Sequence, residues 1–269
     1  MNNMESKLID KVIRCSYKDD TSVNTYKSQK YPDHLHDFYE ILILFKDGIS
    51  FVTDENIHHL YANNLIIIPP LKYHHAQIEE NTDYKRLVLW FTVNESENYT
   101  DIIQLLKNIS VINFSANSGI VSFIQTFLEL IQSCDKKRLY EIAGAFVTSL
   151  LFMIRYSNIK YSEQTKVPPI VTEVVQYLNT NLHKQHTLTE LSKHFAVSSS
   201  HLAKIFKSTM HISIIDYVRE KQLLQAKKDI IEGKRPTLVC FDYGFNDYSC
   251  FYKSFKKKFG VSPNEIKVK

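Results

Sequence analysis

Histidine and acidic side chains with metal-ligand spacing occur in the first third of the sequence. His34 and His36 lie two residues apart, so on a β-strand their imidazoles share one face, as joint ligation requires. Glu40 follows in the same segment, and His74 comes after an apolar run that ends in two prolines. Such groups ligate a divalent metal, contact a bound small molecule or form structural hydrogen bonds. We predict no metal and no cofactor here, and the other two roles stay open.

The sequence offers no other candidate for catalysis. It has no glycine-rich phosphate loop, no Gly-x-Ser-x-Gly pentapeptide, and no cysteine and histidine arranged as nucleophile and base. The 4 cysteines have no Cys-x-x-Cys spacing, which argues against a disulfide framework and against a structural zinc site. We therefore predict that the protein is not an enzyme.

Short strands are predicted to position the histidines. The candidate strands are Glu40–Phe45, Ile49–Thr53, Leu65–Ile68 and Arg86–Val93, with a turn signal at Lys46–Gly48. Residues 20–95 therefore favour a sandwich or a small barrel. Trp90, the only tryptophan, lies on the last of these strands, where its indole would stack on a sugar ring or fill the core.

Helical spacing of apolar residues begins near Thr100 and continues to Tyr156. The last segment, Arg138–Tyr156, carries a broad apolar stripe, which either packs against the strands or forms a helix pair shared between two subunits. Its longest apolar run, Ile142–Ile154, is too short to span a bilayer, and residues 1–18 lack the apolar stretch of a signal peptide. These features predict a cytoplasmic protein.

Charge is distributed unevenly along the chain. Residues 1–165 contain 16 basic and 20 acidic side chains, whereas residues 166–269 contain 17 basic and 9 acidic ones. A compact basic part binds polyanions, because neutralised phosphates release their counterions. The second part of the chain is therefore predicted to bind nucleic acid.

Polar residues 158–169, which end in two prolines, predict a linker between two domains. Beyond the linker, capping signals divide the chain into short helices. These signals are Pro169, the Thr187–Glu190 capping box, Ser198, Ser213, Gly233 with Pro236, the Gly244–Phe245 turn before a cap at Asn246 or Asp247, Gly260, and Ser262–Pro263.

Two of these helical segments repeat at an offset of 49 residues. Leu202, Phe206, Lys207 and Ser213 correspond to Phe251, Phe255, Lys256 and Ser262. Each repeat is a short helix, a turn and a second helix, so the repeat predicts two helix-turn-helix units. The second helix of such a unit lies in the major groove of DNA with its outward side chains on base edges.

The second half resembles the AraC/XylS family of bacterial transcription regulators. The resemblance is carried by Gly244-Phe245-x-Asp247-x-x-x-Phe251-x-x-x-Phe255-Lys256-x-x-x-Gly260-Val261-Ser262-Pro263, by Leu188-x-x-Leu191, by Ser198-x-x-x-Leu202-x-x-x-Phe206-Lys207, and by Tyr217 and Ala226. It covers about Val167–Lys267. The chain departs from the family pattern at Gln222, His211 and Cys240, where the family usually has Arg, Gly and Ala.

The AraC/XylS resemblance implies which side chains meet DNA. Base readers would be Ser200, Ala203, Lys204, Ser249 and Lys253, with Tyr248 and Cys250 beside them, and backbone contacts would come from Lys207, Lys256 and Lys257. For any single lysine a solvated surface charge is the alternative, but the repeat places Lys204 and Lys253 at equivalent positions.

The first half resembles the cupin barrel in its pattern His34-x-His36-x-x-x-Glu40 followed by His74. In metal-binding cupins these four positions hold a metal. In sugar-sensing members of the family the same pattern occurs without metal, and there it contacts the effector or braces the barrel mouth. The resemblance implies an effector site made of His34, His36, Glu40, His74 and Trp90.

Together these features predict an α+β protein: a cupin-like β-barrel with a helical dimerisation segment (1–157), a linker (158–169), and an all-α double helix-turn-helix domain (170–269). The predicted function is a sequence-specific, DNA-binding transcription activator that responds to a small molecule such as a sugar. Its predicted partners are double-stranded DNA, RNA polymerase and a second copy of the chain. The alternatives are a metal-dependent cupin enzyme with a basic tail and a regulator without a small-molecule effector.

Overall fold

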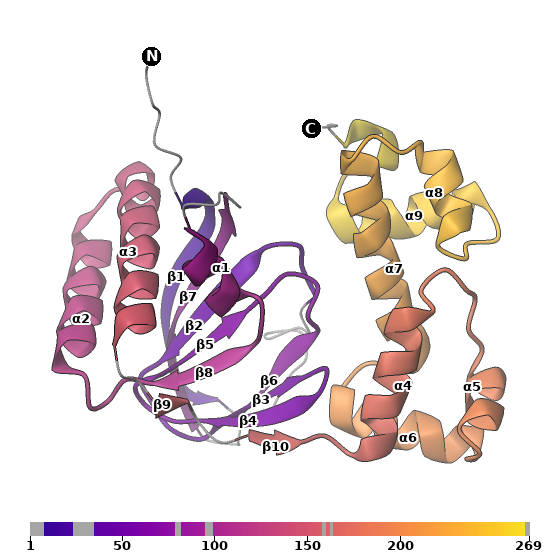
Figure 1. The fold of residues 1–269 in the computed structure, drawn as a ribbon, viewed down its shortest axis with the longest axis horizontal. Coiled ribbons are helices and arrows are strands. Elements are labelled where there is room, and N and C mark those ends of the chain that lie inside the picture. The colour runs from indigo at the N-terminus through magenta and orange to yellow at the C-terminus, as the bar shows by residue number, and fades with distance from the viewer. Residues whose placement is uncertain are drawn as a thin grey trace. The chain divides into compact units, whose positions relative to one another are not determined.

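The computed structural model describes residues 8–23, 35–78, 82–94, 99–157, 160–161 and 164–266. The chain divides into two compact units, one drawn from residues before Lys166 and the other made mainly of Lys166–Lys269 (Figure 1). Strands dominate the first unit and helices form the second, so the architecture is mixed α/β with N-terminal sheets and C-terminal helices.

The first unit contains two sheets. Its strands are β1 (Ile9–Val23), β2 (Tyr39–Leu44), β3 (Ile49–Thr53), β4 (Asn56–Leu60), β5 (Asn64–Ile68), β6 (His74–Ile78), β7 (Thr82–Val93), β8 (Ser110–Asn113), β9 (Lys160–Tyr161) and β10 (Gln164–Lys166). One sheet has the order β1-β7-β2-β5-β8-β9, and the other has the order β10-β4-β3-β6. The described strands are not hydrogen-bonded into a closed barrel, so the expectation of a barrel is corrected to two separate sheets.

Continuous apolar runs place the longer sheet between two hydrophobic layers. On β2, Ile41 and Ile43 belong to a cluster shared with the helices, whereas Leu42 and Leu44 belong to a cluster shared with the second sheet. Successive side chains of a strand point to opposite faces, so a strand buried on both sides must be apolar at every position. This requirement explains the unbroken run that the sequence shows there.

Three helices cover the outer face of the longer sheet: α1 (Thr100–Leu106), α2 (Ser118–Ser133) and α3 (Lys136–Tyr156) (Figure 1). Phe146 of α3 is 4 % exposed and stacks on Phe127 of α2 with ring centroids 3.8 Å apart. Leu150 is 0 % exposed in the same cluster. Most of the apolar stripe thus packs within its own unit, which is the first of the two roles that the sequence allowed.

Arg138–Tyr156 of α3 is, within the described residues, a stretch long and apolar enough to cross a membrane by length and composition. The 13-residue count from the sequence therefore underestimated its length. Six of its side chains lie in the hydrophobic core of the first unit, namely Ala143, Phe146, Val147, Leu150, Leu151 and Ile154. We interpret α3 as a core helix, because its apolar face already has a protein partner.

His58 on β4 should make the stability of the first unit depend on pH. It is 2 % exposed, and burial, with a smaller contribution from His59, lowers its pKa from 6.5 to about 4. Between these values the unfolded chain binds a proton at His58 that the folded chain does not, so stability falls as pH falls from 6.5 towards 4. The expected loss is about 2 kcal/mol at pH 5.

Urea midpoints at pH 7.5 and pH 5 would measure this effect. The variant His58→Gln should show a smaller difference between the two pH values than the wild type. The matched control is His59→Gln, on the exposed face of the same strand, which should keep most of the pH dependence because burial is the larger cause of the lowered pKa of His58. Equal pH dependence in His58→Gln and in the wild type would assign the effect to another group.

The second unit contains six α-helices among its described residues: α4 (Pro169–Thr180), α5 (Leu188–His194), α6 (Ser199–Met210), α7 (Ile214–Ile231), α8 (Pro236–Asp242) and α9 (Tyr248–Phe259), followed by a short 3₁₀ turn, Pro263–Glu265. The expected caps are present. Thr187 and Glu190 form a capping box, and the side chains of Ser198, Ser213 and Asp247 accept backbone N–H groups at the starts of α6, α7 and α9. Each cap satisfies a donor that a helix start leaves unpaired.

Candidate functional site

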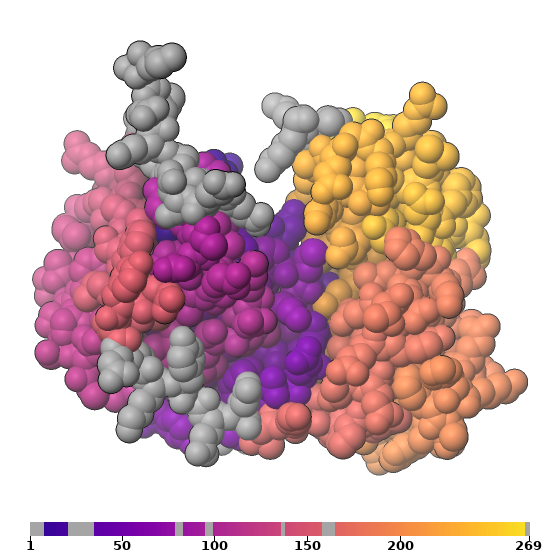
Figure 2. Space-filling view, in the orientation of Figure 1, coloured from indigo at the N-terminus to yellow at the C-terminus, as the bar shows by residue number. Residues whose placement is uncertain are grey.

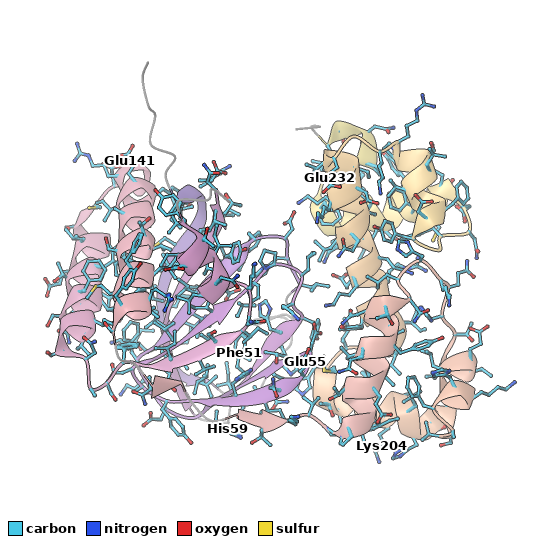
Figure 3. All side chains as sticks on the ribbon, in the orientation of Figure 1. Phe51, Glu55, His59, Glu141, Lys204 and Glu232 are labelled. Carbon is cyan, nitrogen blue, oxygen red and sulfur yellow. The ribbon has the colours of Figure 1, made fainter. Side chains whose placement is uncertain are left out.

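The helix α6 has one face inside the unit and one face in solvent. Leu202, Phe206 and Met210 are each 0 % exposed, and Phe206 packs edge-on against Tyr217 of α7. The solvent face carries Ser200, Lys204 and Lys207, with Ala203 half-buried at its border. Lys204 projects away from the unit (Figure 3).

The helix α9 has the same arrangement. Phe251 and Phe255 are each 0 % exposed. The opposite face presents exposed side chains at five expected positions: Ser249, Cys250, Lys253, Lys256 and Lys257. Tyr248 differs from this group, because its hydroxyl is enclosed by the protein and burial raises its pKa. The Tyr248 hydroxyl is therefore not presented to a groove.

Both outward faces are basic. Within the described part of the chain, no carboxylate forms an ion pair with Lys204, Lys207 or Lys253. Their charges are thus available to phosphates or base edges. Figure 2 shows the residues of the two helical pairs, orange for α5–α6 and yellow for α8–α9, as separate regions of the surface of the second unit.

A second polar cluster joins two strands and the segment before one of them. Glu40 lies on β2 and His74 on β6, whereas His36 precedes β2 and is not on a strand as the sequence predicted. His36, Glu40 and His74 are 8 %, 4 % and 0 % exposed, and their potential ligand atoms all lie within 4.8 Å of one another. Nε2 of His74 is 3.3 Å from Oε2 of Glu40, while its Nδ1 is 2.9 Å from the carbonyl oxygen of Lys72. That carbonyl only accepts, so Nδ1 carries a proton and Nε2 faces the carboxylate. His34 lies outside the described residues.

Two histidines and a carboxylate match a divalent transition metal in donor type. The same three groups also suit the hydroxyl groups of a small molecule, since they offer donors and acceptors inside an apolar shell. The side chain of Phe51 stacks on His74 with centroids 5.5 Å apart, which fixes the orientation of the imidazole.

Trp90 lies beside this cluster on β7. It is directly opposite Glu40 on β2 and opposite Arg14 on β1. The guanidinium carbon of Arg14 is 4.7 Å from the centre of the indole, and Phe38 packs on the indole with centroids 5.0 Å apart. The indole is half-buried, and Trp90 is not a member of either hydrophobic core cluster of the described residues.

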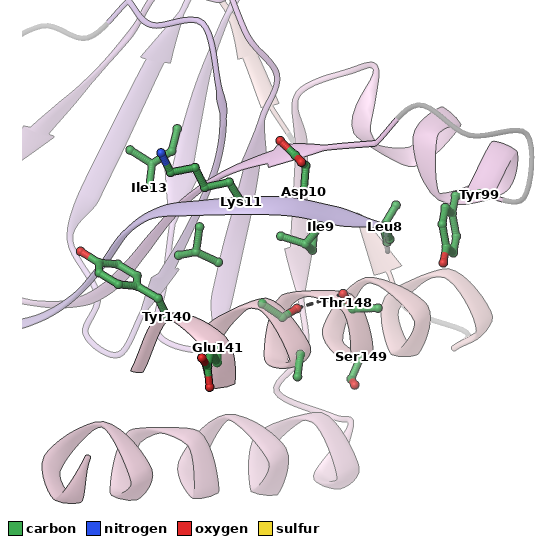
Figure 4. Close-up of a pocket in the computed structure, with 13 residues that line it drawn as sticks. Leu8, Ile9, Asp10, Lys11, Ile13, Tyr99, Tyr140, Glu141, Thr148 and Ser149 are labelled. Carbon is green, nitrogen blue, oxygen red and sulfur yellow. Dashed lines mark hydrogen bonds between the residues drawn. The ribbon is translucent and has the colours of Figure 1, made fainter. Parts of the chain in front are cut away.

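A groove of about 830 Å³ lies elsewhere in the first unit, between β1 and α3. Tyr140, Glu141, Thr148 and Ser149 line it from the helix, and Leu8 and Ile9 line it from the strand side (Figure 4). The hydroxyl of Thr148 already donates to the carbonyl oxygen of Gly144, at 2.9 Å. None of the residues predicted to contact an effector lines this groove.

A sequence model described as a helix-turn-helix domain matches residues 191–268. The chain is 24 % identical over 243 residues to the transcriptional activator RhaS of Mannheimia succiniciproducens, covering 88 % of this chain and 90 % of that protein. It is also 24 % identical over 247 residues to the uncharacterised transcriptional regulator YdiP of Escherichia coli, covering 87 % and 80 %. A third relative, the arabinose operon regulatory protein of Salmonella typhimurium, is 25 % identical over 149 residues, covering 54 % and 53 %.

This chain carries a helix-turn-helix domain of the AraC type and is a DNA-binding transcription regulator. The regulator binds DNA through its second unit, where the helix-turn-helix match lies. Its relatives are transcription regulators, and no relative described above supports the alternative of a cupin enzyme.

Sequence reasoning overlooked one exposed residue of the regulator. His201 lies on α6 between Ser200 and Leu202, and its side chain is exposed. The offset of 49 residues pairs it with Cys250, which was included among the candidate DNA contacts. Applying the repeat in both directions would have identified His201 as a candidate as well.

Proposed function

We propose that the regulator is an activator that binds a small polar molecule, such as a sugar, at the cluster His36, Glu40 and His74. The observation that carries this proposal is the clustering of these three buried polar side chains beside the apolar residues of the two sheets. A mainly apolar site with a few convergent polar groups is the usual form of a small-molecule site. The relationship to the arabinose operon regulatory protein supports a sugar as the ligand class.

The proposal also assigns the DNA contacts. Ser200, Ala203, Lys204, Ser249, Cys250 and Lys253 read base edges, whereas Lys207, Lys256 and Lys257 contact phosphates. The exposure of these side chains supports the assignment, apart from Ala203 at the border of its face. His201 joins this set, and Tyr248 supports α9 from inside.

Further elements of the proposal concern partners and location. The regulator acts in the cytoplasm, contacts RNA polymerase and has no enzymatic activity. It forms a homodimer, and the exposed side of α3, which bears Glu141, Ala145 and Ser149, would supply the contact because the apolar stripe is buried. A ligand at the buried cluster changes transcription only if it binds two states of the protein with different affinity.

A reporter assay in the native host tests the effector site. Genome-wide mapping of bound DNA would first supply a regulated promoter, and sugars and sugar acids would then be screened for induction. Glu40→Gln and His74→Gln should each lose at least about 10-fold in sensitivity to the inducer, because a charge-assisted hydrogen bond contributes about 1.5–3 kcal/mol.

His59→Gln, an exposed histidine of the same unit, should respond like the wild type. DNA binding without inducer should be unchanged in all three variants. Normal induction in both Glu40→Gln and His74→Gln would place the effector, if there is one, away from this cluster.

A further inference from the structure

The loop between α4 and α5 precedes the first helix-turn-helix unit (α5–α6) and contacts the turn of the second one (α8–α9). Its central part, Leu182–Gln185, is here called the bridging loop. Gln222 of α7 is 2 % exposed, and its Nε2 donates to the carbonyl oxygens of Leu182 and Lys184 at 3.0 and 3.1 Å. The buried amide of Gln222 thereby holds the bridging loop against α7 at two points.

The bridging loop also touches the turn that joins α8 to α9. Gly244 in this turn has φ +69°, and a Cβ atom added there would lie 2.9 Å from the carbonyl carbon of Lys184 and 3.0 Å from its oxygen. Real Cβ atoms essentially never come within 3.0 Å of other heavy atoms. The two backbones are therefore as close as a glycine allows.

Polar and aromatic contacts surround this close approach. Nδ1 of His183 lies 2.9 Å from the carbonyl oxygen of Asp242, and its ring stacks on Tyr243 with centroids 5.0 Å apart. Nε2 of Gln185 donates to Oδ1 of Asn246. Each residue from His183 to Gln185 thus contacts the α8–α9 turn.

These contacts create a second connection between the two helix-turn-helix units, α5–α6 and α8–α9. The first connection is α7, which runs from the unit containing α6 to the unit containing α8 and α9 (Figure 1). One helix alone leaves the units able to tilt about its ends. A bridging loop that is attached to α7 and to the opposite turn restrains this tilt, because two separate attachments fix an angle that one does not.

We propose that the bridging loop holds the two helix-turn-helix units in one fixed relative orientation, so that Gln222 and Gly244 determine which spacing between two DNA elements the regulator accepts. The inference rests on the DNA-binding function and requires both recognition helices to contact one duplex. Gln222 and Gly244 are positioning residues, since both act by holding α6 and α9 at a fixed separation.

A DNA-binding domain whose two helix-turn-helix units cannot tilt must discriminate strongly between different spacings of the two DNA elements. Inserting one base pair between two elements moves the second by about 3.4 Å and rotates it by about 34° around the helix axis. A rigid domain must then distort the DNA or lose the contacts of one helix-turn-helix unit. A domain whose bridging loop is detached can tilt and follow the displaced element instead.

The experiment uses the full-length protein and duplex DNA. A pool with 30 randomised base pairs would be selected for binding, and footprinting would locate the two protected elements. Duplexes with one base pair inserted or deleted between the elements would then be compared with the selected duplex. For the wild type, affinity should fall about 10-fold or more at each altered spacing.

Two variants detach the bridging loop by different routes. Gln222→Met keeps the size of the side chain and removes both donors, whereas Gly244→Ala pushes the bridging loop away. In each variant the penalty for an altered spacing should shrink to less than about 3-fold, even where affinity for the selected duplex also falls. Gly260→Ala is the matched control, because Gly260 has a similar φ of +75° but no neighbour within 4 Å of its added Cβ.

The ratio between spacings separates positioning from general destabilisation. Gly260→Ala should weaken binding, if at all, by the same factor at every spacing and keep the penalty of the wild type. A wild type that accepts the extra base pair without loss would overturn the proposal. The proposal would also be overturned if Gln222→Met and Gly244→Ala kept the wild-type penalty for an altered spacing. If the pool yields no bound duplex or only one protected element, DNA binding by both helix-turn-helix units is disproved. This result is distinct from a result that disproves only the role of the bridging loop.

Discussion

Replacing Phe146 by glutamate is expected to unfold the first unit. Phe146 is 4 % exposed and stacks on Phe127 and Phe123 of α2, at centroid distances of 3.8 and 5.0 Å. Removing a buried phenylalanine costs about 3–5 kcal/mol, and a buried unpaired carboxylate adds to that loss. A domain has only about 5–15 kcal/mol of stability in total, so most of it would disappear.

Guanidinium denaturation followed by tryptophan fluorescence measures this change, because Trp90 is the only tryptophan and lies in the first unit. Leu130→Glu on α2 is the control: Leu130 is 40 % exposed, so its variant should denature like the wild type. If Phe146→Glu folds normally and only changes the sedimentation coefficient, Phe146 belongs to a subunit interface after all.

Replacing both Lys204 and Lys253 by alanine should nearly abolish specific DNA binding. The two lysines occupy equivalent positions on α6 and α9, and both are exposed. A base-reading contact contributes about 1–3 kcal/mol, so each single variant should lose about 5- to 150-fold in affinity for the selected duplex. Losses from the two separate elements should add approximately.

Fluorescence anisotropy at two salt concentrations, with the selected duplex and an unrelated one, measures the effect. A base-reading lysine loses affinity mainly on the selected duplex, whereas a phosphate contact loses it equally on both and reduces the salt dependence. Lys228→Ala on α7 is the control, because Lys228 is exposed and pairs with Glu232 at 3.9 Å. Full affinity in the double variant would remove these lysines from the interface.

The second unit was predictable in detail because its signals are local. A cap such as Ser198 or Asp247 acts within three residues, and the repeat at 49 residues confirmed each element independently. The inward faces of α6 and α9 followed from helical periodicity alone. By contrast, the enclosure of the Tyr248 hydroxyl depends on neighbouring segments, and no local pattern encodes it.

The first unit was less predictable because its pairing partners are distant in sequence. β1 was not recognised before residue 20, since Lys11, Arg14 and Lys18 interrupt any apolar alternation. Its partner β7 lies about 70 residues away, so no turn signal connects them. Whether strands close into a barrel, and whether α3 covers its own sheet, are also decided by long-range packing that periodicity does not report.

The exposed charges on β1 have a second consequence, because they lie on an end strand of the longer sheet. β1 is an end strand of the longer sheet, and a long unpaired strand edge invites another chain to add to it. Exposed side chains of both signs line β1, namely Asp10, Lys11, Arg14, Lys18 and Asp19, and its pairing with β7 is interrupted by three irregularities. Charge and irregularity both discourage an incoming strand. The features that hid β1 from sequence analysis therefore also disfavour pairing of β1 with a strand of another chain.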